Sequence, residues 1–463
     1  MGRNEGSNFK KAFFFSFGQI SDQTAYQSFI LLIFTFYYTV VGLNLFLVTL
    51  GYSLWAIWNA LNDPMIGYLS DRTHTRWGRR IPYIMFAFIP LAVSCAFLYR
   101  PPLPIGPANQ VGNFFYFLII IVIFEGFYTA FSLTQTALFP EVFMSQKERT
   151  QANNVREIFI VIALIFAFIL PSFVIEDYSN PASLGQYQVF GIIVGIIVIA
   201  GSLVFLFLAP REKKEFSQDY KQAFGFFKTI IFCFKSKSFR FYVISEFCNW
   251  FVYGMLPTIV PLYAKFVLGI TDTLMISLLL GLTFISAMIF MTILWKPLVR
   301  RIGNRKTWLI SMSVWICTLV PLMFIGDLLS GMIAFFLIGI GLSGSLYIID
   351  LVVADIVDED EIKTGIRREA GYYGVNALVL RLSNVLVILA IGSVLSTVGW
   401  YTFEPSMVTP QVVFGLRTLM FVFPAIALVV AVIAIFFYPL HGERLGQVKE
   451  KQKEIHAEKM GRV

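Results

Sequence analysis

The stretch WNALNDPMIGYLSDRTHTRWGRR, from Trp58 to Arg80, begins inside an apolar segment and ends in a dense cluster of basic side chains. The same contrast runs through the whole chain, in which 57% of the 463 residues are hydrophobic and only 14% are charged. Soluble domains carry about 25% charged residues. A chain this apolar needs the lipid bilayer as its solvent. We therefore interpret the stretch as a membrane-spanning segment that ends in a basic loop.

Apolar segments of similar length recur along the chain. A transmembrane helix needs about 20 predominantly apolar residues, and twelve segments approach or exceed this length. The sequence therefore predicts an all-α membrane protein with twelve transmembrane helices. The segments are Phe13–Val41, Leu45–Leu69, Ile81–Tyr99, Phe114–Phe139, Ala152–Ile175, Tyr187–Leu208, Phe241–Val267, Leu274–Val299, Trp308–Gly326, Met332–Ala354, Tyr372–Val398 and Val412–Tyr438.

The basic residues predict the orientation. Most Lys and Arg residues fall in the two termini and in every second loop, whereas the intervening loops hold only Arg100 and Lys265. Because Lys and Arg are enriched on the cytoplasmic side, both termini are predicted to lie in the cytoplasm. The net charge of +8 is then explained by anionic lipid headgroups along one membrane face. We therefore expect the basic residues to interact with membrane lipids and not with nucleic acid.

The longest polar connection divides the twelve segments into two sets of six. We predict a six-helix bundle over residues 1–208, a cytoplasmic linker over 209–240, a second six-helix bundle over 241–440 and a cytoplasmic tail over 441–463. The loop GYLSDRTHTRWGRRIPY in the first half matches KPLVRRIGNRKTW at the same place in the second half. Matched halves are typical of transporters, whose substrate site lies near the bilayer midplane between them.

A few ionisable residues interrupt the apolar segments. A charge at the bilayer centre costs about 2.5–3.5 kcal/mol on insertion scales, so such residues are candidates for a functional site. The structural alternative is a buried pair that fixes helix packing. The residues we place in a central cavity are Asp22, Asp63, Glu125, Arg156 and Arg381; Glu246 and Asp350 also lie within segments.

The opening stretch contains a candidate ion site. Asn59 and Asp63 are four residues apart, which places them on one face of a helix, and both offer oxygen ligands to a hard cation. Pro64 cannot donate a backbone hydrogen bond, so it leaves a carbonyl near the site without its helical partner.

The sequence predicts no cofactor and no metal centre. The four Cys residues are scattered without ligand or redox spacing, and the three His residues (His74, His441 and His456) all fall in cytoplasmic segments. The bound ion that we expect is a coupling cation, Na⁺ or H⁺.

Three segments resemble one known family. They are NDPMIGYLSDRTHTRWGRRIPYI (Asn62–Ile84), ALFPEVFMSQKERTQANNVREIF (Ala137–Phe159) and VADIVDEDEIKTGIRREAGYYGVNALVLRLSNVL (Val353–Leu386). They lie far apart, in the right order, and resemble the glycoside–pentoside–hexuronide cation symporters, the melibiose-permease-like branch of the major facilitator superfamily. The resemblance implies that superfamily's fold, two six-helix bundles that alternate access to a central site.

The resemblance implies a cation site on the second and fourth helices. The family has two Asp residues one helical turn apart on helix two; Asp63 matches the second, and Asn59 stands in place of the first. Thr129 matches a family Thr on helix four. Because Asn is a weaker ligand than Asp, sodium coupling, proton coupling through Asp63 and uncoupled facilitated transport all stay open.

The resemblance also implies substrate-binding positions, several of them altered. The sugar-binding Asp of helix four falls at Ser132 and its nearby Trp at Thr136, while Asp22 or Gln23 matches the family's Asp on helix one. The substrate is therefore a glycoside or other sugar, or, as in the lysophospholipid symporters of the same branch, an amphiphile. The remaining candidates are Arg156 and Arg381, which match a family Arg and Lys, and four aromatic residues, Tyr26, Tyr128, Tyr372 and Tyr373.

Charged residues in the cytoplasmic loops are candidates for a gate. Salt bridges among them would hold the outward-open state, whereas the alternative is that the cations only set the topology. The gate candidates are Asp71, Arg72, Arg79, Arg80, Asp355, Asp358 and Arg367.

The function we expect is secondary active transport, with a small-molecule substrate and a coupling cation, by a monomer in the cell membrane. A membrane enzyme such as a lipid-linked glycosyltransferase is the second class considered. It would need a second acidic cluster or a His motif at the membrane face, so we expect no enzyme activity. A receptor derived from a transporter is the third class, which the ionisable residues Asp63, Arg156 and Arg381 disfavour.

Overall fold

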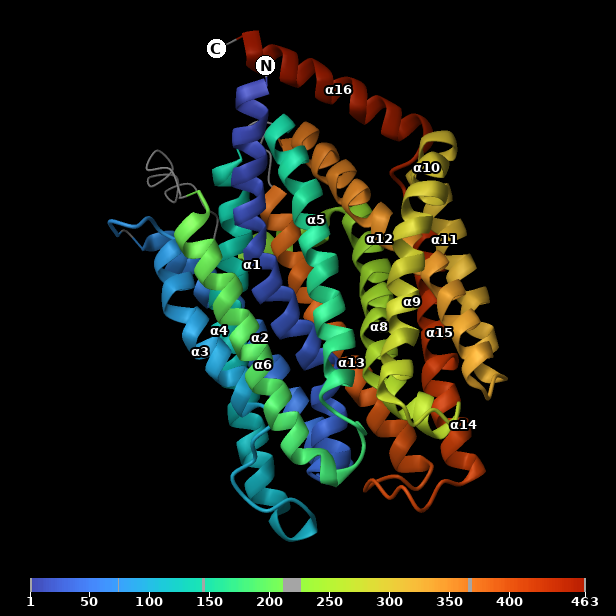
Figure 1. Ribbon diagram of the computed structural model, residues 1–463. Coiled ribbons are helices and arrows are strands. Elements are labelled where there is room, and N and C mark those ends of the chain that lie inside the picture. Colours follow the sequence, from blue (N-terminus) through green and yellow to red (C-terminus); the bar gives the residue numbers. More distant parts are fainter. Residues whose placement is uncertain (1, 74, 144–145, 211–225, 365–368, 462–463) are drawn as a thin grey trace. The chain divides into compact units, whose positions relative to one another are not determined.

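The chain folds into long helices joined by short connections (Figure 1). The computed structural model describes residues 2–73, 75–143, 146–210, 226–364 and 369–461, and these residues contain no β-strand. The helices are α1 (Gly2–Thr35), η1 (Phe36–Val40), α2 (Leu45–Arg72), α3 (Ile81–Phe97), η2 (Pro107–Asn109), α4 (Gln110–Val142), α5 (Gln146–Ile169), η3 (Leu170–Phe173), η4 (Pro181–Ser183), α6 (Leu184–Leu208), α7 (Phe226–Lys235), α8 (Lys237–Phe266), α9 (Thr273–Phe290), η6 (Met291–Trp295), α10 (Lys296–Ile302), α11 (Asn304–Leu319), η7 (Val320–Met323), α12 (Leu328–Thr364), α13 (Glu369–Thr397), α14 (Pro410–Met420), α15 (Val422–Phe436) and α16 (Gly442–Gly461).

The all-α prediction is confirmed for these residues, and each of the twelve predicted segments corresponds to one helix or to two or three consecutive helices. Within the described part of the chain, ten helical stretches are long and apolar enough to cross a membrane. The other two predicted segments correspond to α3, which is apolar but shorter, and to α1 with η1. The protein is therefore a multi-pass membrane protein, and the full count of twelve stays a prediction.

The chain divides into two compact units. Unit 1 comprises residues 1–223 with two short later segments, 271–277 and 399–407; unit 2 comprises the rest. The short segments are joined to unit 1 by hydrogen bonds, such as that between the hydroxyls of Tyr178 and Ser277 at 3.0 Å. Residues 211–225, which form much of the predicted linker, lie outside the described residues.

In unit 1, α1 packs against α5 and α6, α2 packs against α4, and α3 packs between α4 and α6. The amide side chain of Asn44 caps α2, because its oxygen accepts a hydrogen bond from the Leu47 backbone nitrogen at 2.9 Å. From there α2 continues through Pro64 to Arg72. The helix therefore carries Asn59 and Asp63 on one face, as their spacing predicts.

In unit 2, α8 packs against α13 and α15, and α11 packs against α12 and α15. Hydroxyl groups join α9 to α12: Thr283 donates to the Phe335 carbonyl at 2.9 Å and Ser286 donates to the Phe336 carbonyl at 2.6 Å. The last helix, α16, runs across the direction of the long helices of this unit and packs on α12 (Figure 1).

Candidate functional site

Four oxygen-bearing side chains meet where α2 packs on α4. This α2–α4 cluster consists of Asn59 and Asp63 from α2 and Glu125 and Thr129 from α4. The Thr129 hydroxyl donates to the Asp63 carboxylate at 3.0 Å and lies 3.5 Å from the Glu125 carboxylate. Asn59, Glu125 and Thr129 are buried, and Asp63 is half-buried. Of the three residues predicted for the cation site, the structure thus brings Asp63 and Thr129 together, and Asn59 lies one helical turn from Asp63 on α2.

Asn59 is the unusual member of the α2–α4 cluster. It is 0% exposed, and neither atom of its side-chain amide has a hydrogen-bond partner among the residues that the structure describes. Buried polar groups are nearly always paired, because an unpaired one costs the full free energy of desolvation. An unpartnered amide oxygen one helical turn from the Asp63 carboxylate, which itself meets the Thr129 hydroxyl, offers ligands of the kind that suit a hard cation.

A second polar cluster surrounds Asp22 on α1. The carboxylate, which is 3% exposed, accepts a hydrogen bond from the Gln23 side chain at 2.8 Å. The hydroxyls of Tyr128 and Ser132, both on α4, and the positive charge of Arg156 on α5 act on the same carboxylate. Four of the six predicted substrate-binding residues, Asp22, Gln23, Ser132 and Arg156, therefore belong to one neighbourhood in unit 1.

Aromatic rings extend the Asp22 neighbourhood along α1 and α4. The rings of Tyr26 and Tyr128 stack with centroids 4.8 Å apart, and Phe124 stacks on Tyr128 at 5.9 Å. Phe29 then stacks on Phe124 at 4.8 Å. A stack that ends in a tyrosine beside a buried carboxylate has both an apolar face and hydrogen-bonding groups, which is the combination that a sugar ring or an amphiphile requires.

The remaining predicted substrate residues lie elsewhere. Thr136 on α4 is exposed, and Arg381 lies on α13 in unit 2, half-buried. Tyr372 is buried on α13 with its ring against Phe239, at 5.0 Å between centroids. The side chain of Tyr373 lies outside the described residues.

The predicted gate residues fall into three groups. Arg367 and the side chains of Asp71 and Arg72 lie outside the described residues. Arg79 and Arg80 lie in the turn between α2 and α3, where Arg79 is buried. The two acidic candidates, Asp355 and Asp358, are described with their partners.

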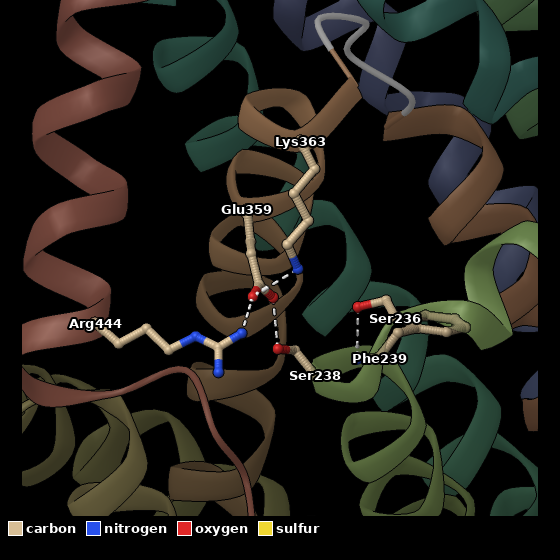
Figure 2. Close-up of polar contacts among 6 residues, drawn as sticks. All are labelled: Ser236, Ser238, Phe239, Glu359, Lys363 and Arg444. Atoms are coloured by element: carbon tan, nitrogen blue, oxygen red, sulfur yellow. Dashed lines mark hydrogen bonds and ion pairs between the residues drawn. The ribbon is translucent and has the colours of Figure 1, made fainter.

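The partners of Asp355 and Asp358 come from the C-terminal helix. The Nζ of Lys449 on α16 lies 2.7 Å from a carboxylate oxygen of each, and Arg444 of α16 pairs with Glu359. We call Asp355, Asp358 and Glu359 the α12 acidic end; all three are buried. Figure 2 shows Glu359 between three donors from different helices. The other groups bonded to the α12 acidic end are Ser238, Asn304, Lys363 and Gln452.

Lys449 holds its proton firmly in this position. Partial burial acts to lower the pKa of Lys449, but the hydrogen bonds and charges of Asp355 and Asp358 outweigh it and raise the pKa above the ordinary value. A raised pKa means that the contact stabilises the fold fully below the ordinary pKa of about 10.4 and is lost only as the pH rises further. The C-terminal helix is therefore attached throughout the neutral range.

Lys449→Ala is expected to lower the free energy of unfolding by about 1–2 kcal/mol. The substitution leaves the buried Asp355 and Asp358 without the Lys449 ammonium that they share. Because this ammonium is half-exposed, the expected loss of stability lies between the values for surface and buried ion pairs. The measurement is the melting temperature of the detergent-purified protein. Lys451→Ala is the matched control, because Lys451 is exposed on the same helix. Equal melting temperatures for the two variants would show that the contact of Lys449 with Asp355 and Asp358 does not stabilise the protein.

The site prediction omitted two sets of residues. Glu125 was predicted for a central cavity but not for the cation site, although its spacing of four residues from Thr129 places the two on one helix face. The sequence predicts only a cytoplasmic tail for the α16 residues Arg444, Lys449 and Gln452. The sequence feature that could have indicated this pairing is the basic character of the C-terminal helix, set against the acidic residues at the end of α12.

Comparison with known proteins places the chain among membrane transporters. The family model described as MFS/sugar transport protein matches residues 14–442. An uncharacterised symporter of Synechocystis sp. is 23% identical over 86% of this chain and 89% of its own length. The putative sulfoquinovose importer of Escherichia coli is 25% identical over 86% of this chain and 85% of its own length. A shorter match, 34% identical over 21% of this chain and 18% of the relative, is to the sodium-dependent lysophosphatidylcholine symporter 1-A of Danio rerio.

The fold is also that of solved transporters. The crystal structure of the nucleoside transporter NupG superposes with a TM-score of 0.66 over 92% of this chain and 99% of that chain, at 14% sequence identity. At this identity the likeness shows the fold alone, and the fold is that of the major facilitator superfamily. The chain therefore belongs to the MFS/sugar transport protein family, and it is a symporter-type membrane transporter related to the glycoside–pentoside–hexuronide symporters.

Proposed function

We propose that this protein carries a glycoside or related sugar together with a cation, by alternating access between two six-helix bundles of twelve transmembrane helices. The observation that carries the proposal is the α2–α4 cluster. It gathers two carboxylates, a hydroxyl and an unpartnered amide oxygen in a buried position next to the Asp22 neighbourhood on α1 and α4. In this proposal both termini lie in the cytoplasm, because Lys and Arg residues gather in the termini and in every second loop.

The coupling cation binds at the α2–α4 cluster in this proposal. Asp63 supplies charge, Thr129 positions the carboxylate through its 3.0 Å hydrogen bond, and Asn59 turns its amide oxygen to the ion. Glu125 replaces the negative charge that Asn59 lacks. Two carboxylates, one from each helix, therefore stand in for a pair of Asp residues on a single helix, and this arrangement suits Na⁺ as well as H⁺.

The substrate binds at the Asp22 neighbourhood. Carboxylate, amide and hydroxyl groups from Asp22, Gln23 and Ser132 accept and donate hydrogen bonds to sugar hydroxyls, and the stacked rings of Tyr26 and Tyr128 pack against a sugar face. The positive charge of Arg156 acts on the same carboxylate. The cation site and the substrate site thus share α4, on which Thr129 and Ser132 are three residues apart. Through this shared helix the binding of one ligand changes the affinity for the other.

The test is the melting temperature of the purified protein with glycosides, hexuronides and lysophospholipids, each with sodium, with lithium and at two pH values. Binding to the folded state raises the melting temperature as occupancy rises. We expect a sugar to raise it, and the rise to increase with sodium. If the rise in melting temperature with a sugar depends on pH and not on sodium, the coupling ion is a proton. No effect of any sugar would overturn the proposed substrate.

A lysophospholipid is the second candidate substrate. One observation favours it, the local 34% identity to a lysophosphatidylcholine symporter. In the same panel, a rise with lysophospholipids alone would select this substrate and reject the sugar.

A further inference from the structure

Unit 2 contains a buried carboxylate that the proposed cation and substrate sites do not use. Glu246 on α8 is 0% exposed. One oxygen, Oε2, accepts a hydrogen bond from the indole nitrogen of Trp250 at 2.8 Å. The other oxygen, Oε1, has no hydrogen-bond partner among the described residues. Buried carboxylates usually have every oxygen paired, so Glu246 requires an explanation.

Two hydrogen bonds fix the register of α8 against α12. Ser238 donates to Glu359, and eleven residues further along α8 the side chain of Asn249 accepts from Ser345 at 2.6 Å. From the first bond to the second, the residue number rises on α8 and falls on α12, so the two helices run antiparallel. Asn249 is itself buried, and its Nδ2 has no partner among the described residues.

This register places Glu246 opposite Asp350. Glu246 precedes Asn249 by three residues, and Asp350 follows Ser345 by five, on helices of opposite direction. The negative charge of Asp350 acts on Glu246. The two carboxyl groups differ in exposure, because Asp350 is exposed and Glu246 is fully buried. One carboxyl group therefore opens to the surface and the other lies behind it.

Ionised Glu246 is disfavoured in this setting on two grounds. A fully buried carboxylate loses its hydration, and a second negative charge nearby opposes ionisation further. Within the described interactions, Asp350 is the charged group that acts on it, and Trp250 is its hydrogen-bond donor. The other helices packed on α8 are α7, α13, α14 and α15; their described charged residues are Lys235, Arg381 and Arg417, and α15 has none.

We propose that Glu246 is a proton-binding site, with Asp350 as the group through which the proton reaches the surface. In the release step the O–H bond of the Glu246 carboxylic acid breaks and an O–H bond forms on an Asp350 carboxylate oxygen. The negative charge moves to Glu246, where the Trp250 indole stabilises it, and Asp350 then gives the proton to water. The site is separate from the α2–α4 cluster in unit 1 and requires no substrate.

The experiment is infrared difference spectroscopy of the purified protein as a function of pH, without any ligand. We expect a C=O stretch of protonated carboxyl groups at neutral pH in the wild type, and the loss of the Glu246 contribution to this band in Glu246→Gln. Glu404→Gln is the matched control, because Glu404 is exposed in unit 1, and it should keep the band. A band of undiminished wild-type intensity in Glu246→Gln would overturn the proposal.

Two further variants test the mechanism in folded protein even if Glu246→Gln fails to fold. Asp350→Asn removes the opposing charge, so the midpoint of the titration should move to lower pH by about one pH unit. Trp250→Phe removes the donor that stabilises the ionised form, so the midpoint should move to higher pH. Unchanged midpoints in both variants would show that Glu246 only holds α8 in place and would refute a proton site. Because the assay contains neither sugar nor sodium, its failure is distinguishable from a failure of the symport proposal.

Discussion

Asp63→Asn is expected to lower cation affinity about 100-fold and to abolish the cation-dependent rise in melting temperature. The substitution keeps the size of the side chain and removes the negative charge that the Thr129 hydroxyl faces at 3.0 Å. Removing one charged partner from a buried pair costs about 3 kcal/mol, which is roughly 100-fold in affinity. The measurement is sodium-dependent thermal stabilisation, followed by uptake into proteoliposomes for whichever substrate the panel identifies.

The control for Asp63→Asn lies on the same helix. Ser53 donates its hydroxyl to the Thr49 carbonyl within α2, so Ser53→Ala should keep the full cation response. Asn59→Asp is the opposite test, because it adds a carboxylate where the buried amide is unpartnered, and it should lower the sodium concentration needed for the half-maximal response. If Asp63→Asn responds to sodium as the wild type does, the cation site is not the α2–α4 cluster.

The helices of this protein could be predicted from the lengths and positions of its apolar segments, whereas the contacts between them could not. The spacing of Asn59 and Asp63 predicts one helix face because helical geometry is local, and α2 confirms it. Thr129 entered the cation site only through the family resemblance, since nothing local places residue 129 beside residue 63. The structure brings the two side chains to 3.0 Å, and no periodicity in the sequence encodes that contact.

The C-terminal helix shows the same limit. Its Lys449 and Arg444 look like any basic cytoplasmic tail, and the sequence offers Asp355 and Asp358 several basic loops as partners. The structure pairs them with α16. Selecting among many possible ion pairs requires the distances between helix ends, and these depend on how α12 packs in unit 2. The assignment of a gate to the α12 acidic end therefore stays a prediction, as does the role of Arg381.

Gly341→Ala is expected to lower the stability of the protein by about 3 kcal/mol. Gly341 lies on α12 where that helix meets α11, and a Cβ atom at this position would lie 2.4 Å from both Cα and Cβ of the fully buried Trp315. Small residues let transmembrane helices approach closely, and overpacking a tight contact costs about 1–3 kcal/mol. We expect the upper end of this range because the added Cβ would meet the backbone of Trp315, which cannot move aside by changing rotamer. The measurements are the melting temperature and the monodisperse fraction in size-exclusion chromatography.

The matched control for Gly341→Ala is Gly374→Ala on α13, where an added Cβ would have no atom of the described residues within 4 Å beyond its chain neighbours and the nearby backbone of its own helix. Alanine favours a helix over glycine by about 1 kcal/mol, so this variant should melt at or slightly above the wild-type temperature. The two substitutions change intrinsic helix propensity equally, and their difference therefore isolates the close approach of α12 to Trp315. Equal melting temperatures would mean that α11 and α12 lie further apart. In that case the position of α12, on which the Asp350 and α12 acidic end assignments both depend, would be wrong.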